Sequence, residues 1–65
     1  MTLKERALGA IDDAFNDQVQ QLFKGLHLNS LSEPNEAAMA RFRRGFKNLL
    51  TDYVIAQDAI KASFQ

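Results

Sequence analysis

Apolar residues recur through the first half of the chain at the spacing of an α-helix. Their mean separation is 3.6 residues, and they are Leu8, Ile11, Phe15, Val19, Leu22 and Leu26. Thr2, followed three residues later by Glu5, is typical of a capping box, so a helix is expected to start directly after Thr2. We predict a first helix over residues 3–27, with Gly25 and Asn29 as the alternative stop signals.

The second half of the chain alternates steps of three and four between apolar residues, which is a heptad pattern. These residues are Met39, Phe42, Phe46, Leu49, Tyr53, Ala56 and Ile60. Ser32 is a suitable N-cap and Pro34 is tolerated in a first turn, so the pattern predicts a second helix over residues 33–63. Leu28 and Leu31, just before it, are expected to cover the end of the helical bundle.

The two patterns match each other when the chain folds back on itself. With a loop over residues 28–32 and the fold at Ser30, Phe15 lies opposite Phe46. The same alignment brings acidic residues level with basic ones: Asp12, Asp13 and Asp17 with Arg43, Arg44 and Lys47. We therefore predict a single all-α domain over residues 1–65, an antiparallel two-helix hairpin. The expected core, within the hairpin or between two hairpins of a dimer, consists of Leu8, Ile11, Phe15, Val19, Leu22, Met39, Phe42, Phe46, Leu49, Tyr53 and Ile60.

The apolar arc of the second helix is wider than one neighbouring helix needs. Leu50, Val54 and Phe64 extend it to nearly half of the circumference. A chain of 65 residues, folded alone, also buries only about 60% of the surface that its unfolded form exposes, and it has no cysteine for a disulfide. We therefore expect a homodimer in which two hairpins form a four-helix bundle, with docking on another protein as the alternative.

Charge and composition narrow the function classes only slightly. Eight basic residues balance eight acidic ones, which favours neither nucleic acid nor an acidic partner. No run of about 18 apolar residues predicts a membrane span, and the N-terminal segment lacks the pattern of a secretory signal. We expect a cytoplasmic protein without a metal or cofactor, because the one histidine, His27, has no companion ligands.

The most distinctive segment is a basic cluster in the second helix, formed by Arg41, Arg43, Arg44 and Lys47. None of these residues has an acidic residue three or four positions away on the helix. One interpretation is a phosphate-binding stripe for RNA or DNA. The other is a solvated helix face, partly paired with the acidic residues of the first helix. Ile55, on the polar back of the helix near Arg44, is a further candidate for partner contact.

No set of residues in the sequence predicts catalysis. His27 lies off the apolar stripe and has no carboxylate or nucleophile at a suggestive spacing. Tyr53 and Gln57 lie on the core arc, where a hydroxyl and an amide need hydrogen-bond partners, so we expect them to be satisfied within the core rather than to act in catalysis. We therefore predict a small non-enzymatic interaction module that acts through protein contacts as a homo-oligomer. The alternative is an RNA- or DNA-binding regulator that uses the basic cluster.

Overall fold

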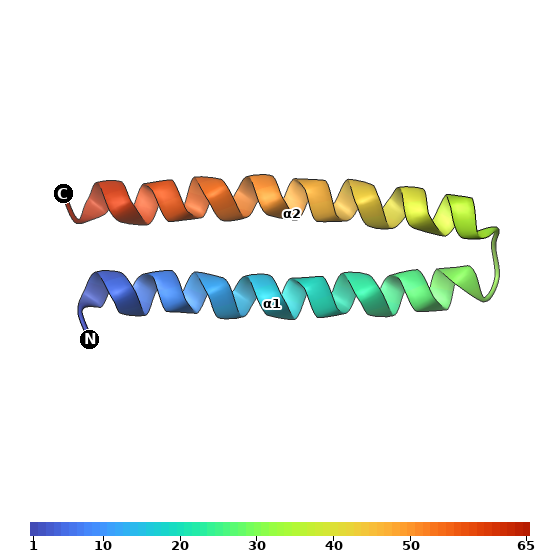
Figure 1. Cartoon of the computed structure of the whole chain (residues 1–65), viewed down its shortest axis with the longest axis horizontal. Coiled ribbons are helices and arrows are strands. Elements are labelled where there is room, and N and C mark those ends of the chain that lie inside the picture. Colours follow the sequence, from blue (N-terminus) through green and yellow to red (C-terminus); the bar gives the residue numbers. More distant parts are fainter.

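The computed structural model describes all 65 residues and contains two long helices that lie side by side and run in opposite directions (Figure 1). Helix α1 spans Leu3–Ser30 and helix α2 spans Asn35–Ser63. The N- and C-termini lie at one end of the hairpin, and the loop of residues 31–34 lies at the other. The structure confirms an all-α helical hairpin. Its Cα atoms extend over 48 × 18 × 8 Å, so the molecule is long and flat.

The start of α1 follows the sequence prediction. The backbone N–H of Glu5 donates to Oγ1 of Thr2 over 3.1 Å, and the backbone N–H of Thr2 donates to Oε1 of Glu5 over 3.3 Å. These two reciprocal bonds form a capping box, which satisfies amide groups that have no partner within the helix. Glu5 also places a negative charge at the positive end of the helix dipole.

Helix α1 ends later in the chain than the sequence predicted. The helix continues to Ser30, past both Gly25 and Asn29, and no residue of the chain has a positive φ angle. A left-handed residue is not needed to end the helix. The carbonyl of Asn29 instead accepts from the backbone amides of Ser32 and Glu33, over 3.1 and 3.0 Å. These bonds satisfy the last turn and carry the chain into the loop.

The start of α2 also differs from the prediction. The helix begins at Asn35 after Pro34, and Ser32 does not cap it. The carbonyl of Pro34 accepts from the amides of Ala37 and Ala38, and the φ angle of Pro34, −56°, is already near the helical value. The loop therefore lies at residues 31–34, rather than at residues 28–32.

The later loop changes how the helices align. Asp12 lies level with Tyr53, where a fold at Ser30 would have placed it opposite Leu49. The displacement is about four residues, or roughly one helical turn. Phe15 consequently lies between two rings of α2, with ring centroids 4.6 Å from Tyr53 and 6.3 Å from Phe46. The predicted charge pairing is lost, since no ion pair joins the acidic residues of α1 to the basic cluster.

The core is a thin seam between the helices. Ala38 alone is fully buried, at 1% exposure, and most of the predicted core residues are half-buried. Met39 is half exposed in the single hairpin, so it lies outside the seam. It follows Ala38 directly, and adjacent helical residues point about 100° apart, so only one of them can face α1. Leu28 and Leu31 are also exposed and do not cover the bundle end.

Gly45 marks a close approach of the two helices. A Cβ atom built at this glycine would lie 2.8 Å from Cδ2 of Leu22 on α1. The side chain of Leu22 therefore occupies the space that a larger residue at position 45 would need. At Gly9 and Gly25 no atom lies within 4 Å of such a Cβ, so those glycines have no comparable packing role.

Candidate interaction surfaces

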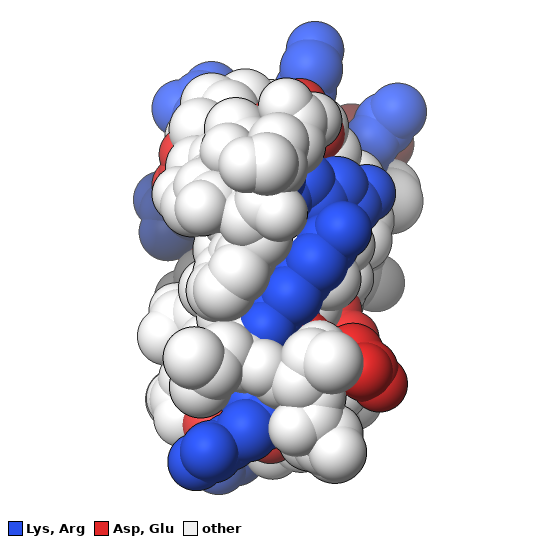
Figure 2. Space-filling model, turned by 90° about the vertical axis from the view of Figure 1, so that its left-hand side faces the viewer, with Lys and Arg blue, Asp and Glu red and all other residues white.

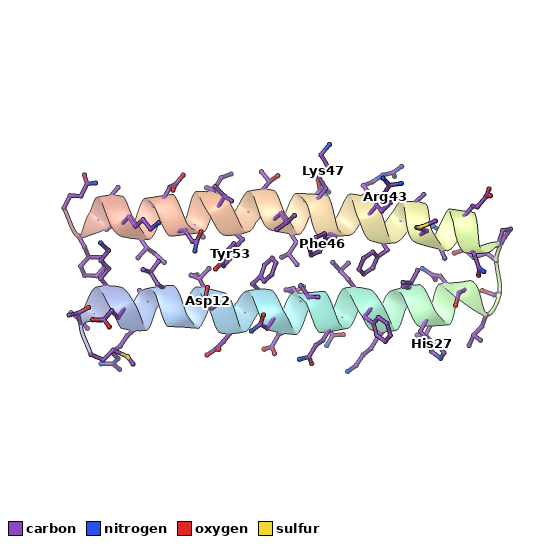
Figure 3. All side chains as sticks on the ribbon, in the orientation of Figure 1. Asp12, His27, Arg43, Phe46, Lys47 and Tyr53 are labelled. Atoms are coloured by element: carbon purple, nitrogen blue, oxygen red, sulfur yellow. The ribbon has the colours of Figure 1, made fainter.

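Charged side chains are distributed over both helices. Viewed from the end that carries the two termini, uncharged surface covers much of the molecule, and Lys and Arg side chains project around it (Figure 2). All members of the basic cluster are exposed on α2: Arg41, Arg43, Arg44 and Lys47. They lie within about 9 Å along the helix axis. Arg43 and Lys47 point away from α1 (Figure 3).

One member of the basic cluster is neutralised by an acid that the helical spacing did not indicate. Nη1 of Arg41 lies 2.9 Å from Oε1 of Glu33, which precedes Pro34 in the loop. Eight residues separate the pair, and the bend before α2 brings the loop back over the first turns of the helix. Arg43, Arg44 and Lys47 form no ion pair. Three basic residues of the cluster are therefore left without an ion-pair partner.

The main polar link between the helices is formed by Asp12, Tyr53 and Gln57. The hydroxyl of Tyr53 donates to Oδ1 of Asp12, and Nε2 of Gln57 donates to the same hydroxyl over 3.0 Å. Tyr53 and Asp12 point toward each other across the hairpin (Figure 3). The bond to Asp12 raises the pKa of the Tyr53 phenol above its ordinary value of 10.0, with smaller contributions from desolvation and the carboxylate charge. The sequence predicted a satisfied Tyr53 but did not identify Asp12 as its partner.

This network also shows which surfaces of the two helices share a side. Phe23 follows Asp12 by eleven residues, about three helical turns, so both lie on one side of α1. Leu50 lies three residues before Tyr53 and seven before Gln57, on the corresponding side of α2. Because Asp12 and Gln57 meet at the Tyr53 hydroxyl, Phe23 and Leu50 flank the same side of the hairpin.

That side carries a run of exposed apolar side chains, which we call the apolar face. Its members are Phe23, Met39, Leu50 and Val54. Each is at least 40% exposed, and the three on α2 follow one helical stripe together with the half-buried Phe46. Ile55 is 61% exposed and lies on the other flank of α2, in the stripe of Arg44 and Asn48.

The opposite side of the hairpin is different in character. Two shallow grooves run along it, one toward the loop and one near the middle. The residues that line them from outside the seam are small or polar: Ala14, Gln18, Gln21, Gly25, Arg41, Asp52 and Ala56. Ala14 lies two residues after Asp12, and Ala56 two residues after Val54, which turns each of them about 200° away from the apolar face.

No cluster of candidate metal ligands accompanies these surfaces. His27 is exposed, points away from α2 (Figure 3) and has no side-chain hydrogen bond. No three His, Cys, Asp or Glu residues are grouped so that they would hold a metal ion. Neither helix combines the length and the apolar character needed to cross a membrane. Comparisons of the chain with protein-family models, curated proteins and solved structures gave no match.

Proposed function

We propose that this chain is a small non-enzymatic interaction module that acts through protein contacts as a homodimer of helical hairpins. The observation that carries the proposal is the incomplete burial of the single chain. Only one residue of 65 is buried, and ten large hydrophobic residues are at least 40% exposed. Such surface in a small domain is typical of one that completes its core with a partner.

The surface area supports the same proposal quantitatively. The chain exposes 5165 Å², whereas a compact folded monomer of its mass, 7.3 kDa, exposes about 4,200 Å². Its radius of gyration is 15.1 Å, against about 11 Å for a compact domain of this length. The excess surface, about 1,000 Å², is comparable to the ~800 Å² that each partner buries in a standard protein interface.

Sedimentation equilibrium at micromolar concentration tests the dimer. We expect a mass near twice 7.3 kDa, together with a helix content that falls on dilution, because folding and association are coupled in such assemblies. A chain that remains fully helical and monomeric across the micromolar range would overturn the proposal. The non-enzymatic part is supported by His27, which has no side-chain partner to orient it for proton transfer.

A second candidate function, binding of RNA or DNA, is favoured by the three basic residues that have no ion-pair partner. Arg43, Arg44 and Lys47 are exposed within two turns of α2, and a dimer would present them twice. Binding to a generic duplex DNA and a single-stranded RNA at 50 and 200 mM salt, followed by fluorescence anisotropy, tests this candidate. Phosphate contacts by these residues predict an affinity that falls at least about tenfold between the two salt concentrations.

A matched pair of variants makes this test specific. The double variant Arg44→Ala/Lys47→Ala should lose the salt-dependent binding. Lys24→Ala, which removes one exposed charge from α1, should retain it. Absence of binding at 50 mM salt, or equal binding by all three proteins, would remove the nucleic-acid candidate.

A further inference from the structure

We infer that the apolar face is the surface on which a second copy of this chain docks, and that the grooved side remains exposed in the dimer. This inference rests on the proposed homodimer and adds which of the two broad sides of the hairpin is buried. The two broad sides expose different side chains, and this difference indicates which side the second copy covers. The apolar face carries the exposed side chains of Phe23, Met39, Leu50 and Val54. On the grooved side the large apolar residues belong to the half-buried seam, and the residues outside the seam are small or polar.

The shape of the hairpin leaves two surfaces that are large enough. The molecule is only 8 Å thick between its broad sides in Cα extent, and each broad side measures 48 × 18 Å, roughly 900 Å². That outline is close to the ~800 Å² per partner of a standard interface. The narrow edges of the hairpin are too small to bury a comparable area. A second copy must therefore pack on one of the broad sides to form a stable dimer.

The chemistry of the two sides selects the apolar face. Burial of apolar surface stabilises an interface by about 25 cal/mol per Å², and large side chains at the interface centre contribute most. Leu50 and Val54 are 40% and 51% exposed in the single hairpin and lie near the middle of α2. Covering the grooved side would desolvate Gln18, Gln21 and Asp52, which form no side-chain hydrogen bond. On the side of the apolar face, Asp12 and Gln57 are already hydrogen-bonded to Tyr53.

The charges along the two edges of the apolar face favour a second copy over an unrelated helix. The edge on α1 carries Glu5 and Asp12, with no Lys or Arg. The edge on α2 carries Arg43, Lys47 and Lys61, with Glu36 as an acid near the loop. A twofold axis parallel to the helices places α1 of one protomer beside α2 of its partner at the level that Asp12 and Tyr53 define, which brings Glu5 level with Lys61 on both sides. The face is thus complementary to itself, as an isologous interface requires.

Val54 and Ile55 provide a closely matched test of this inference. They are consecutive β-branched residues of α2, 51% and 61% exposed, and their side chains point about 100° apart, so only Val54 lies on the apolar face. In sedimentation equilibrium, Val54→Glu should weaken dimerisation at least about a hundredfold, because it buries an unpaired charge in the interface. Ile55→Glu makes the same chemical change outside the interface, so it should leave the dimer mass unchanged.

A second measurement covers the case in which Val54→Glu does not fold. The chain has no cysteine, so Val54→Cys and Ile55→Cys each introduce a single thiol. In the dimer, reaction with a soluble thiol reagent should be at least about tenfold slower for Val54→Cys than for Ile55→Cys. On dilution into the monomer range, the two rates should converge.

The outcomes distinguish this inference from the proposed function. A wild-type chain that is a folded monomer overturns both. A wild-type dimer that dissociates with Ile55→Glu and persists with Val54→Glu retains the dimer but assigns its interface to the other flank of α2. Equal thiol reactivity of the two cysteine variants in a dimer likewise overturns the assignment of the apolar face.

Discussion

The hydroxyl of Tyr53 on α2 donates a hydrogen bond to the carboxylate of Asp12 on α1, which precedes it by 41 residues. This bond joins positions on opposite helices and identifies their alignment. Ionisation of Tyr53 would remove the donated proton and place a phenolate beside the carboxylate. The hydrogen bond is therefore the main reason that the pKa of Tyr53 is raised in the folded chain.

The raised pKa predicts a loss of stability at alkaline pH. Below pH 10.0, Tyr53 is neutral in both the folded and the unfolded chain, so its full contribution is present. As the pH rises above 10.0, the unfolded chain ionises first, and the free energy of unfolding falls. Urea unfolding followed by circular dichroism should show this fall in the wild type and a smaller fall in Tyr53→Phe. Identical pH profiles for the two proteins would contradict the role of the bond.

The ring of Phe15 should be a main stabilising contact of the seam. It packs against both Tyr53 and Phe46, at centroid distances of 4.6 and 6.3 Å. We expect Phe15→Ala to lower the free energy of unfolding by roughly 2–3 kcal/mol, less than in a fully buried core because the ring is half-buried. Leu28→Ala, at an exposed position of the same helix, should change it by less than about 0.5 kcal/mol. Both are measured by urea unfolding at one protein concentration.

Two glycines should respond differently to the same substitution. Gly9→Ala removes a poor helix former where nothing lies within 4 Å, so it should stabilise the chain by up to about 1 kcal/mol. Gly45→Ala gains the same propensity but places a methyl group 2.8 Å from Cδ2 of Leu22. The midpoint of thermal unfolding should therefore rise more for Gly9→Ala than for Gly45→Ala. Equal increases would mean that the approach at Gly45 is not close in solution.

The capping box should hold the first turn of α1 in place. Thr2→Ala removes the acceptor of the Glu5 amide, and loss of an N-cap costs about 1 kcal/mol. Amide hydrogen exchange in the first turn should become faster, while exchange in the middle of α1 stays the same when that end frays alone. Thr2→Ser keeps the hydroxyl and should keep the slow exchange. Rapid exchange of the Glu5 amide in the wild type would contradict the cap.

The helices and their pairing could be predicted because repeated apolar positions reflect long stretches of structure. The alignment could not, because it depends on a few local bonds at one end. The amides of Ser32 and Glu33 bind the carbonyl of Asn29, which extends α1 and moves the loop toward Pro34. An apolar pattern that repeats each turn fits almost as well when the partner helix is shifted by one turn.

Two further details of the structure also depend on local geometry that the apolar pattern does not contain. The apolar repeat selected Met39 for the core, but Ala38 faces α1, since a small residue fits where the helices first come together. The pairing of Arg41 with Glu33 was missed because helical spacing considers only neighbours within a helix. The residues of the basic cluster are exposed, which fits both interpretations of its charges. Whether it binds a ligand stays a prediction.

The two ends of the hairpin differ in their use as attachment points, because both termini lie at one end. Both ends of the polypeptide emerge from the same extremity of a body 48 Å long, and the loop occupies the opposite extremity (Figure 1). A fluorescent protein or surface tether fused to either terminus would therefore be held at one pole. The loop end and the grooved side would project into the medium, which makes the hairpin suitable for immobilised binding measurements from either terminus.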